Sequence, residues 1–325
     1  MIASAAKALD AALEVSVAGS FSRLGIAARR RLFGWDSLPP DMTGRVVLLT
    51  GASSGIGRAA ALQLARLGAE LVLVGRDAER LAAVELGCID AGAPAVRTIR
   101  CDLTLLSEAR RLVDQMKESH DRLDVLIHNA GALVHDYRQT SEGFEQTFAA
   151  QVLSQHVITC GLLPLLSTTP DSRVIVVSSG GMYAERLVAD QVEYDAEHYD
   201  GVRAYARAKR AQVALNEEWA VRTPGAQPVF HAMHPGWADT PGVAASLPGF
   251  RRVTGPFLRT PEEGADTIVW LATAPEAAES SGRFWLDRAP RSTVKVPWTN
   301  PEDGEAGRLW DLVCRLTGEL PRTSA

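Results

Sequence analysis

The stretch Thr50-Gly51-Ala52-Ser53-Ser54-Gly55-Ile56-Gly57 decides the fold. It follows the apolar run Arg45–Leu49, which reads as a buried parallel strand, and it opens a helical stretch from Arg58 to Leu67. Its glycines permit positive φ and close approach of the backbone, while the amide N–H groups at the helix start can bind an anion. A tight turn without a ligand is the alternative, but the strand and helix context favours a dinucleotide phosphate site. The expected cofactor contacts are Gly51, Ser53, Ser54, Gly55, Ile56 and Gly57.

The composition excludes several classes of protein. The 325 residues are 46% hydrophobic and 22% charged, which is typical of a globular protein with a substantial core. A net charge of −5 gives no basic field for nucleic acid. The four cysteines are scattered, so we expect buried thiols, no metal site and a reducing, cytoplasmic location. No apolar stretch reaches about eighteen residues, and charges interrupt the N-terminus, so we expect neither a spanning helix nor a secretory signal.

Residues 1–43 differ in pattern from the rest of the chain. Ala5–Ala18 is alanine-rich, Phe21–Trp35 mixes apolar residues with four arginines, and Leu38-Pro39-Pro40-Asp41 indicates a break. A basic amphipathic segment can lie on an anionic membrane surface, or it can pack on the protein's own body or on a second subunit. The pattern does not separate these alternatives, so peripheral membrane contact and a homo-oligomer both stay open.

From Gly44 to Pro290, short apolar runs alternate with helical patterns. The expected strands are Arg45–Leu49, Leu71–Val74, Val96–Ile99, Val125–Ile127, Val174–Val177, Val229–Met233 and Phe284–Leu286. The expected helices are Gly57–Leu67, Asp77–Asp90, Leu106–Ser119, Gly143–Leu166, Arg203–Val221 and Pro261–Thr273. This alternation predicts an α/β fold with a doubly wound parallel sheet, helices on both faces and a ligand site at the carboxyl edge of the strands. Residues 291–325 form a tail with a short helix around Leu309–Leu316.

Arg76 bears on the choice of cofactor. It follows the second expected strand, about twenty residues past the glycine loop, where an acidic residue would bind the ribose of NAD. A guanidinium pairs instead with a 2′-phosphate, so Arg76 favours NADP over NAD, with a solvated surface arginine as the alternative. Asp77 is an acidic residue that would favour NAD if it bound the ribose, but we expect it to cap the helix that begins at Ala78.

Two further turns follow successive strands. After the third strand, Asp102 can accept a hydrogen bond from an adenine amino group, and Leu103 can pack on its ring. After the fourth strand, Asn129, Ala130 and Gly131 would let the backbone approach the cofactor. Each turn alone is common, and their regular placement is what indicates a cofactor site.

Ser179, Tyr205 and Lys209 carry the chemistry. Ser178 and Ser179 follow the fifth strand, while Tyr205 and Lys209 share one face of a helix at i and i+4. A nearby ammonium favours tyrosinate, so we expect the pKa of Tyr205 to fall below its usual value of about 10. Tyr205 can then act as general acid and base, and Ser179 can polarise a carbonyl. An ordinary surface pair is the alternative for Tyr205 and Lys209.

Together the glycine loop, Asn129-Ala130-Gly131, Ser179, Tyr205-x-x-x-Lys209 and Pro235-Gly236-x-x-x-Thr240 resemble the short-chain dehydrogenase/reductase family. The resemblance covers about residues 44–290, and segments between Met233 and Arg288 are similar to its retinol-dehydrogenase-like branch. It implies a single Rossmann-fold domain with seven parallel strands. It also implies that Tyr205 donates the proton, that Lys209 holds the nicotinamide ribose and that Ser179, the second serine, orients the substrate. Pro235, Gly236 and Thr240 would lie at the nicotinamide end.

Gln151 departs from the family pattern. The family usually has an asparagine at this position, where it helps to anchor a water molecule of a proton relay. Glutamine carries the same amide on a longer stem, so the resemblance implies a shifted or rebuilt relay.

Two functions remain. The first is an NADP(H)-dependent oxidoreductase that acts on a carbonyl or alcohol, with Tyr205 as general acid and base. Segments after Ser179 and Thr240 would cover a lipophilic substrate, with ordinary packing as the alternative; their apolar residues are Met182, Tyr183, Leu187, Val188, Val243, Leu247, Phe250 and Phe257. The second is a non-catalytic NADP-binding sensor or scaffold, which Gln151 and the N-terminal extension favour. His234 has no partner at ligand spacing, so we expect it to be structural.

Overall fold

The strands expected from the sequence lie side by side in one sheet. The computed structural model describes the chain apart from residues 1, 36–40, 224, 226 and 322–325. Within these described residues, eight strands follow the order β3-β2-β1-β4-β5-β6-β7-β8. They are β1 Val46–Thr50, β2 Glu70–Gly75, β3 Val96–Arg100, β4 Val125–His128, β5 Arg173–Val177, β6 Val229–Met233, β7 Arg283–Leu286 and β8 Ala289–Pro290.

The first seven strands are parallel, as predicted. The additional strand β8 pairs antiparallel with β7 over two residues, Ala289 and Pro290. Sequence reasoning missed it because two residues are too short to show alternating hydrophobicity. The prediction of a doubly wound Rossmann fold is therefore confirmed, with eight strands in place of seven.

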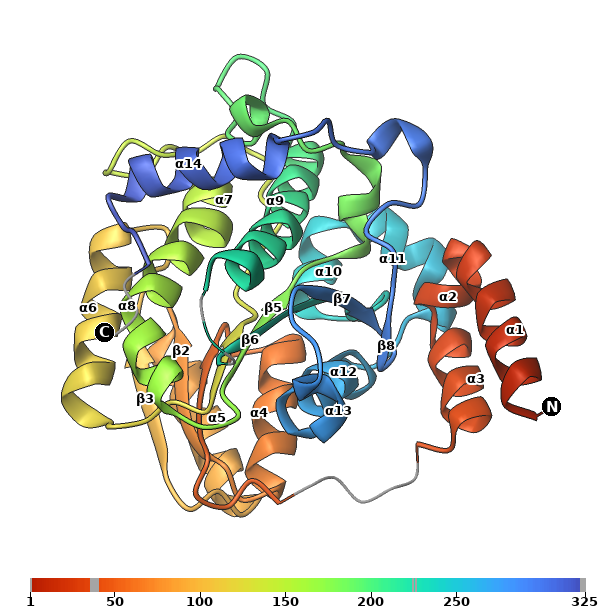
Figure 1. Cartoon of the computed structure of the whole chain (residues 1–325), viewed down its shortest axis with the longest axis horizontal. Coiled ribbons are helices and arrows are strands. Elements are labelled where there is room, and N and C mark those ends of the chain that lie inside the picture. The colour runs from red at the N-terminus through yellow and green to blue at the C-terminus, as the bar shows by residue number, and fades with distance from the viewer. Residues whose placement is uncertain (1, 36–40, 224, 226, 322–325) are drawn as a thin grey trace.

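Helices cover both faces of the sheet (Figure 1). The helices of the first layer are α4 Gly55–Arg66, α5 Ala78–Asp90, α12 Pro261–Thr273 and the short α13 Pro275–Ala278. Those of the second layer are α6 Leu106–Ser119, α7 Gln146–Phe148, α8 Ser154–Thr168, α9 Gly201–Arg222 and α14 Glu305–Thr317. Val47 and Leu49 of β1 face the first layer, whereas Val46 and Leu48 face the second, because successive side chains of a strand point to opposite faces. The short helices α10 Pro241–Ser246 and α11 Pro248–Thr254 follow β6.

The helix predicted over 143–166 is interrupted. A π-helical turn, Ala149–Leu153, separates α7 from α8. The whole stretch Gln146–Thr168 is long and apolar enough to cross a membrane by length and composition, contrary to our sequence expectation. However, 78% of its apolar window is buried inside the fold, as in the core helix of a globular domain.

The N-terminal extension forms three helices that pack on the body of the protein. They are α1 Ile2–Val15, α2 Val17–Phe21 and α3 Arg23–Phe33, and Figure 1 shows them beside β8 and α11. Phe21, Ile26 and Arg29 are buried in this contact. The described residues therefore show the packing alternative. Of the predicted break, residues 38–40 lie outside the described part of the chain.

Candidate functional site

The glycine loop lies at the carboxyl end of β1, where the strand order reverses between β1 and β4. Gly51 and Gly55 have φ of +68° and +54°, a region that side chains disfavour. A Cβ on Gly57 would lie 2.2 Å from the carbonyl oxygen of Gly51. The side chain of Ser54 does not cap α4, so the first amide N–H groups of this helix can bind an anion.

Asn129 holds the glycine loop from the neighbouring strand. Its Nδ2 donates to the carbonyl oxygens of Thr50 and Gly51 at 3.0 and 3.1 Å. In return, Thr50 Oγ1 accepts from the main-chain N–H groups of Asn129 and Ala130. The structure thus brings two predicted motifs together, with the amide of Asn129 directed at the loop. Ser53 is half-buried at the same loop, while the side chain of Ile56 packs toward Gly264 of α12.

The predicted adenine end lies at the ends of β2 and β3. Arg76 is exposed, and its carbonyl oxygen accepts from Arg100 Nε at 3.3 Å. Asp77 caps α5, as predicted, because its carboxylate accepts from the N–H of Arg80 at 3.0 Å. Arg100, the last residue of β3, is a second exposed guanidinium here that sequence reasoning missed, since it lies just beyond the predicted strand Val96–Ile99 and belongs to no motif.

Asp102 and Leu103 lie in the turn after β3. Asp102 Oδ1 accepts from the N–H of Thr104 at 3.1 Å, which shapes the turn. Leu103 is buried, and its carbonyl oxygen accepts from the hydroxyl of Ser154 at 2.6 Å. Both residues therefore form hydrogen bonds that stabilise the fold, in addition to any contact with a ligand.

The two serines after β5 point in different directions. Ser178 is buried, and its hydroxyl donates to the carbonyl oxygen of Lys209 at 2.9 Å. Ser179 is half-buried, and its hydroxyl lies close enough to the phenol of Tyr205 to lower the pKa of that group. Its Oγ also accepts from the N–H of Gly181 at 3.1 Å. Ser178 is therefore engaged with the backbone of α9, whereas Ser179 is the serine that lies beside Tyr205.

Lys209 lies one turn along α9 from Tyr205. Its Nζ donates to the carbonyl oxygen of Val177 at 3.0 Å and lies 5.4 Å from the centre of the Tyr205 ring. A Cβ on Gly131 would lie 3.0 Å from Lys209 Nζ and 2.9 Å from Gln151 Oε1. The side chains of Lys209 and Gln151 therefore both lie against Gly131, in the loop after β4.

The Pro235-Gly236 turn and Thr240 close the other side. Gly236 has φ of +74°, and the carbonyl oxygen of Pro235 accepts from Arg259 Nη1 at 3.3 Å. Thr240 caps α10 by accepting from the N–H of Val243. The Cβ of Thr240 lies 3.3 Å from the position a Cβ on Gly55 would take. The loop after β6 therefore contacts the glycine loop after β1.

A sequence profile described as short chain dehydrogenase matches residues 45–248. The chain belongs to the short-chain dehydrogenase/reductase family. It is therefore an oxidoreductase of CH–OH and C=O groups that binds a nicotinamide cofactor and a small-molecule substrate.

Two relatives match most of the chain. Dehydrogenase/reductase SDR family member 12 of Bos taurus is 40% identical over 91% of this chain and 93% of its own length. Retinol dehydrogenase 14 of Homo sapiens is 33% identical over 87% of this chain and 89% of its own length. These relatives confirm the retinol-dehydrogenase-like branch that the motifs indicate.

Solved structures share the fold. A short chain dehydrogenase structure from Escherichia coli CFT073, complexed with NADPH, is 25% identical and has a TM-score of 0.62, covering 76% of this chain and 98% of that one. A structure from Mycobacterium paratuberculosis is 27% identical, with a TM-score of 0.69, and covers 87% of this chain and 97% of that one.

Burial sets the protonation of the two central groups in this short-chain dehydrogenase/reductase. It raises the pKa of Tyr205 above its usual value, against a smaller lowering by the Ser179 hydroxyl. It lowers the pKa of Lys209 to about 7. The expected fall in the pKa of Tyr205 is thus wrong for the protein alone, because the low-dielectric site disfavours tyrosinate and ammonium alike.

The π-helical turn places Gln151 at the edge of this site. Its Nε2 donates to the carbonyl oxygen of Ala132 at 2.9 Å, while its buried Oε1 has no hydrogen-bond partner among the described residues. The main-chain carbonyl oxygen of Gln151 accepts from Gln212 Nε2 at 2.8 Å. Sequence reasoning missed Gln212, because a π-helical turn leaves no hydrophobic pattern that distinguishes it from an α-helix.

Several predicted covering residues lie in the core instead. Met182 and Leu187 are buried, and the hydroxyl of Tyr183 donates to the carbonyl oxygen of Ser292 at 2.8 Å. These three side chains therefore show the ordinary-packing alternative. Val243 and Leu247 remain half-buried beside Thr240.

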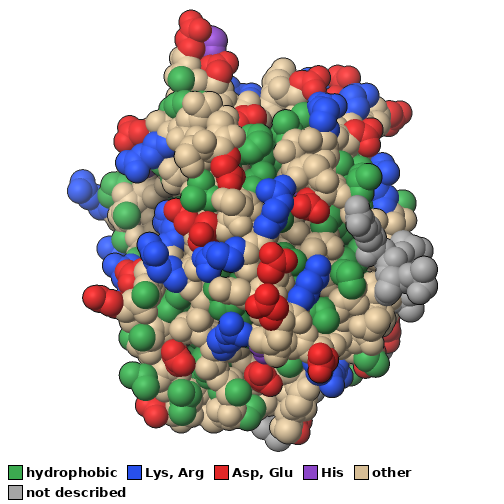
Figure 2. All heavy atoms as spheres, turned by 90° about the vertical axis from the view of Figure 1, so that its left-hand side faces the viewer, with side chains coloured by type: hydrophobic (Ala, Val, Ile, Leu, Met, Phe, Trp, Pro, Cys, Tyr) green, Lys and Arg blue, Asp and Glu red, His purple; other side chains and the backbone are tan. Residues whose placement is uncertain are grey.

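The remaining polar candidates are structural. The Nδ1 atom of His234 accepts from the N–H of Gly236, and burial, reinforced by nearby cations, holds the pKa of this imidazole well below its usual value. All four cysteines are buried free thiols. On the face shown in Figure 2, basic and acidic side chains are interspersed without a continuous basic patch.

Proposed function

We propose that this protein is an NADP(H)-dependent oxidoreductase that moves hydride between nicotinamide and a lipophilic carbonyl or alcohol, with Tyr205 as general acid and base. One observation carries the proposal: Ser179 and Lys209 flank Tyr205 at the carboxyl edge of the sheet, with Lys209 Nζ 5.4 Å from the centre of the Tyr205 ring and the Ser179 hydroxyl near enough to affect the pKa of the phenol. The glycine loop has no room for side chains at Gly51 and Gly57, and the start of α4 is uncapped. A dinucleotide phosphate would fit there, beside these catalytic groups. When bound, the nicotinamide supplies or accepts the hydride.

The side chains then handle the proton and the developing charge. The raised pKa of Tyr205 keeps the phenol protonated at neutral pH, so it can donate to the carbonyl oxygen of the substrate. The Ser179 hydroxyl can donate to the same oxygen and stabilise its negative charge. Lys209, with a pKa of about 7, can release or take up a proton near neutral pH. Gln151 Oε1, buried near Lys209, would accept from the next group along the relay.

NADP is the proposed cofactor because of two guanidinium groups. Arg76 and Arg100 are exposed at the adjoining ends of β2 and β3, and Arg100 Nε donates to the carbonyl oxygen of Arg76. Asp77, the competing acidic residue, is engaged in capping α5. Two neighbouring guanidinium groups are better suited to binding a 2′-phosphate than a ribose hydroxyl.

A lipophilic substrate fits the segment after Thr240. Val243 and Leu247 are half-buried there, and the ring of Phe250 packs on Trp237 at 5.2 Å. The matched relative named retinol dehydrogenase 14 supports a substrate of this kind.

The test is turnover of NADPH by the full-length protein with aldehydes, ketones, retinoids and steroids, followed by absorbance. Tyr205→Phe should abolish turnover and leave NADPH binding intact. Ser179→Ala should lower turnover strongly, whereas Ser178→Ala, the matched control, should stay within about threefold because its hydroxyl faces the α9 backbone. Wild-type protein that binds NADPH but turns over no substrate would favour the sensor or scaffold function, for which Gln151 is the supporting departure.

We propose a cytoplasmic location in which membrane contact is peripheral at most. The buried sides of α1–α3 face the body, yet Leu9, Leu24 and Phe33 are exposed on these helices. Full-length protein should therefore remain in the supernatant with neutral liposomes. Co-sedimentation that is lost in a Leu9→Ser, Leu24→Ser, Phe33→Ser variant would instead establish a membrane surface. Analytical ultracentrifugation of the same samples tests for a homo-oligomer.

A further inference from the structure

The N-terminal extension reaches both loops on the substrate side of the site. Phe21, at the end of α2, is 2% exposed, and its ring centre lies 4.3 Å from that of His234 and 6.1 Å from that of Trp237. Its carbonyl oxygen accepts from the N–H of Trp237 at 2.8 Å. A residue from the first helices therefore lies between the loop after β5 and the loop after β6.

Two glycines make room for this residue. A Cβ on Gly180 would lie 2.6 Å from Cε2 of the Phe21 ring. A Cβ on Gly236 would lie 2.6 Å from the carbonyl oxygen of Phe21. Gly180 directly follows Ser179, and Gly236 belongs to the turn at the nicotinamide end. The aromatic ring thus contacts the main chain next to the substrate-side serine.

Arg259 holds the turn that presents Phe21. Its Nη2 and Nε donate to the carbonyl oxygens of Ser20 and Ser22, on either side of Phe21, at 2.9 and 3.2 Å. Its Nη1 donates to Asp287 at 2.6 Å and to the carbonyl oxygen of Pro235 at 3.3 Å. One buried guanidinium therefore fixes the Phe21 turn and the loop after β6 together.

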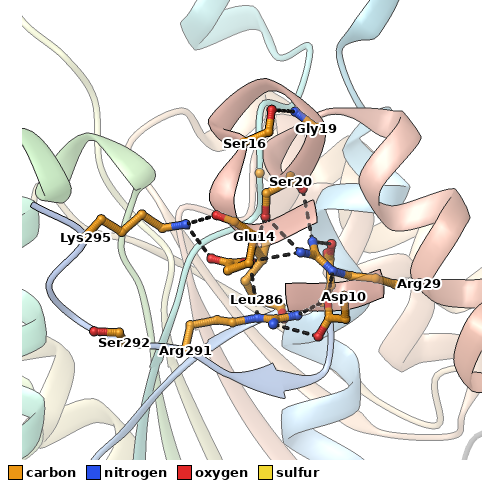
Figure 3. Close-up of polar contacts among 12 residues, drawn as sticks. Asp10, Glu14, Ser16, Gly19, Ser20, Arg29, Leu286, Arg291, Ser292 and Lys295 are labelled. Atoms are coloured by element: carbon orange, nitrogen blue, oxygen red, sulfur yellow. Dashed lines mark hydrogen bonds and ion pairs between the residues drawn. The ribbon is translucent and has the colours of Figure 1, made fainter. Parts of the chain in front are cut away.

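A buried ionic network anchors the helices themselves (Figure 3). Arg29, fully buried, donates to Asp10 at 2.7 Å, to Glu14 at 2.9 Å and to Asp287 at 2.6 Å. Arg291 pairs with Asp10 at 2.8 Å, and Lys295 donates to Glu14. Because Arg29 and Asp287 are fully shielded from solvent, their mutual orientation is tightly set, unlike that of exposed ion pairs.

We propose that Phe21 is a positioning residue for Ser179. Its ring, held by Arg259 and the ionic network, presses on Gly180 and fixes the Ser179-Gly180-Gly181 turn, so that the Ser179 hydroxyl faces Tyr205. The proposal rests on the proposed oxidoreductase function. It makes the N-terminal extension a component of the substrate side of the catalytic site.

The test compares Phe21→Ala with Leu24→Ala in the full-length chain. Leu24 is 59% exposed on the neighbouring helix, so it controls for a general effect of altering the extension. Phe21→Ala should lower kcat about 30-fold, with the Kd of NADPH within about twofold, because only the serine turn loses its support. Leu24→Ala should match wild type. Phe21→Leu, which refills part of the space, should recover most of kcat.

A double-mutant cycle with Ser179→Ala separates positioning from stability. If Phe21 acts through Ser179, adding Phe21→Ala to Ser179→Ala should cost no more than about twofold further activity. Additive losses, or a Phe21→Ala protein as active as wild type, would overturn the proposal. Gly180→Ala provides a second variant should Phe21→Ala fold poorly, because its Cβ displaces the ring from the opposite side and should also lower kcat.

The Gly181 amide gives a readout that does not depend on turnover. Its N–H donates to Ser179 Oγ, so hydrogen exchange at this amide should be faster in Phe21→Ala and unchanged in Leu24→Ala. Unchanged exchange in Phe21→Ala would refute the positioning role. If wild type turns over none of the compounds, the proposed function fails, and this amide still decides the inference.

Discussion

The cofactor half and the substrate half of the site are held in different ways. On the cofactor side, the conformation of the glycine loop is held by close main-chain contacts: Gly57 has no room for a Cβ, and the side-chain amide of Asn129 donates to the loop. On the substrate side, Arg259 donates to the carbonyl oxygens of Ser22 and Ser20, which lie 237 and 239 positions away in the sequence. It thereby joins the Phe21 turn to the loop after β6. A local constraint depends on the identity of a few residues, whereas a long-range one depends on a network that can be weakened step by step.

The largest expected effect is on the network. Asp287 has φ of +54° and accepts from both Arg29 and Arg259, so Asp287→Asn keeps a residue that tolerates this conformation but removes the counter-charge. The free energy of unfolding should fall by about 3 kcal/mol, because the buried guanidinium of Arg259 loses its carboxylate partner and that of Arg29 keeps only Asp10 and Glu14. Urea denaturation measures it.

Asp239→Asn is the matched control for that change, since its partner Arg251 is exposed. It should cost less than about 1 kcal/mol. An equal loss in both variants would contradict the distinction between the buried network and a surface pair.

Next in size is Gly57→Ala, which probes the main-chain constraint. Alanine usually stabilises a helix relative to glycine, but here its Cβ would meet the carbonyl oxygen of Gly51 and displace the loop. NADPH should bind about 100-fold more weakly. Gly249→Ala, where a Cβ meets nothing within 4 Å, should bind NADPH as wild type does. Titration of NADPH fluorescence measures binding by both variants. Unchanged binding by Gly57→Ala would contradict the main-chain constraint on the glycine loop.

These contrasting constraints explain what could be predicted. The strands, the glycine loop and the pairing of Tyr205 with Lys209 follow from local patterns, and the structure places them as expected. Phe21, Arg259 and Gln212 could not be found this way, because their partners lie far away in the sequence. The pKa of Tyr205 was mispredicted for a related reason: spacing reveals the nearby lysine but not the burial that outweighs it.

Arg76→Ala tests the adenine end of the cofactor half. Losing one charge-assisted contact to a 2′-phosphate should raise the KM for NADPH about tenfold and leave that for NADH unchanged. Arg80→Ala, in the first turn of α5, is the control, because its guanidinium pairs with Asp77. Steady-state kinetics with both cofactors measures the difference, and equal effects on NADPH and NADH would refute the role of Arg76.

The smallest expected effect concerns Lys209 and pH. Its pKa is about 7 in the folded protein, below the ordinary value of 10.5, so above pH 7 the unfolded chain holds a proton that the folded chain has released. Stability should therefore rise with pH, by about 1 kcal/mol between pH 7 and 8, relative to Lys209→Met. Urea denaturation between pH 7 and 8 measures it, with the exposed Lys117→Met as the control. Parallel curves for wild type and Lys209→Met would show that burial does not perturb this amine.

The short strand β8 has a consequence for how copies of this chain could meet. It covers the outer side of β7, and its last residue, Pro290, has no N–H to donate. A neighbouring molecule consequently finds only a two-residue edge strand here, which is short for extending the sheet. Strand addition is therefore disfavoured at this edge of the sheet, and β3 is the edge strand at the opposite side.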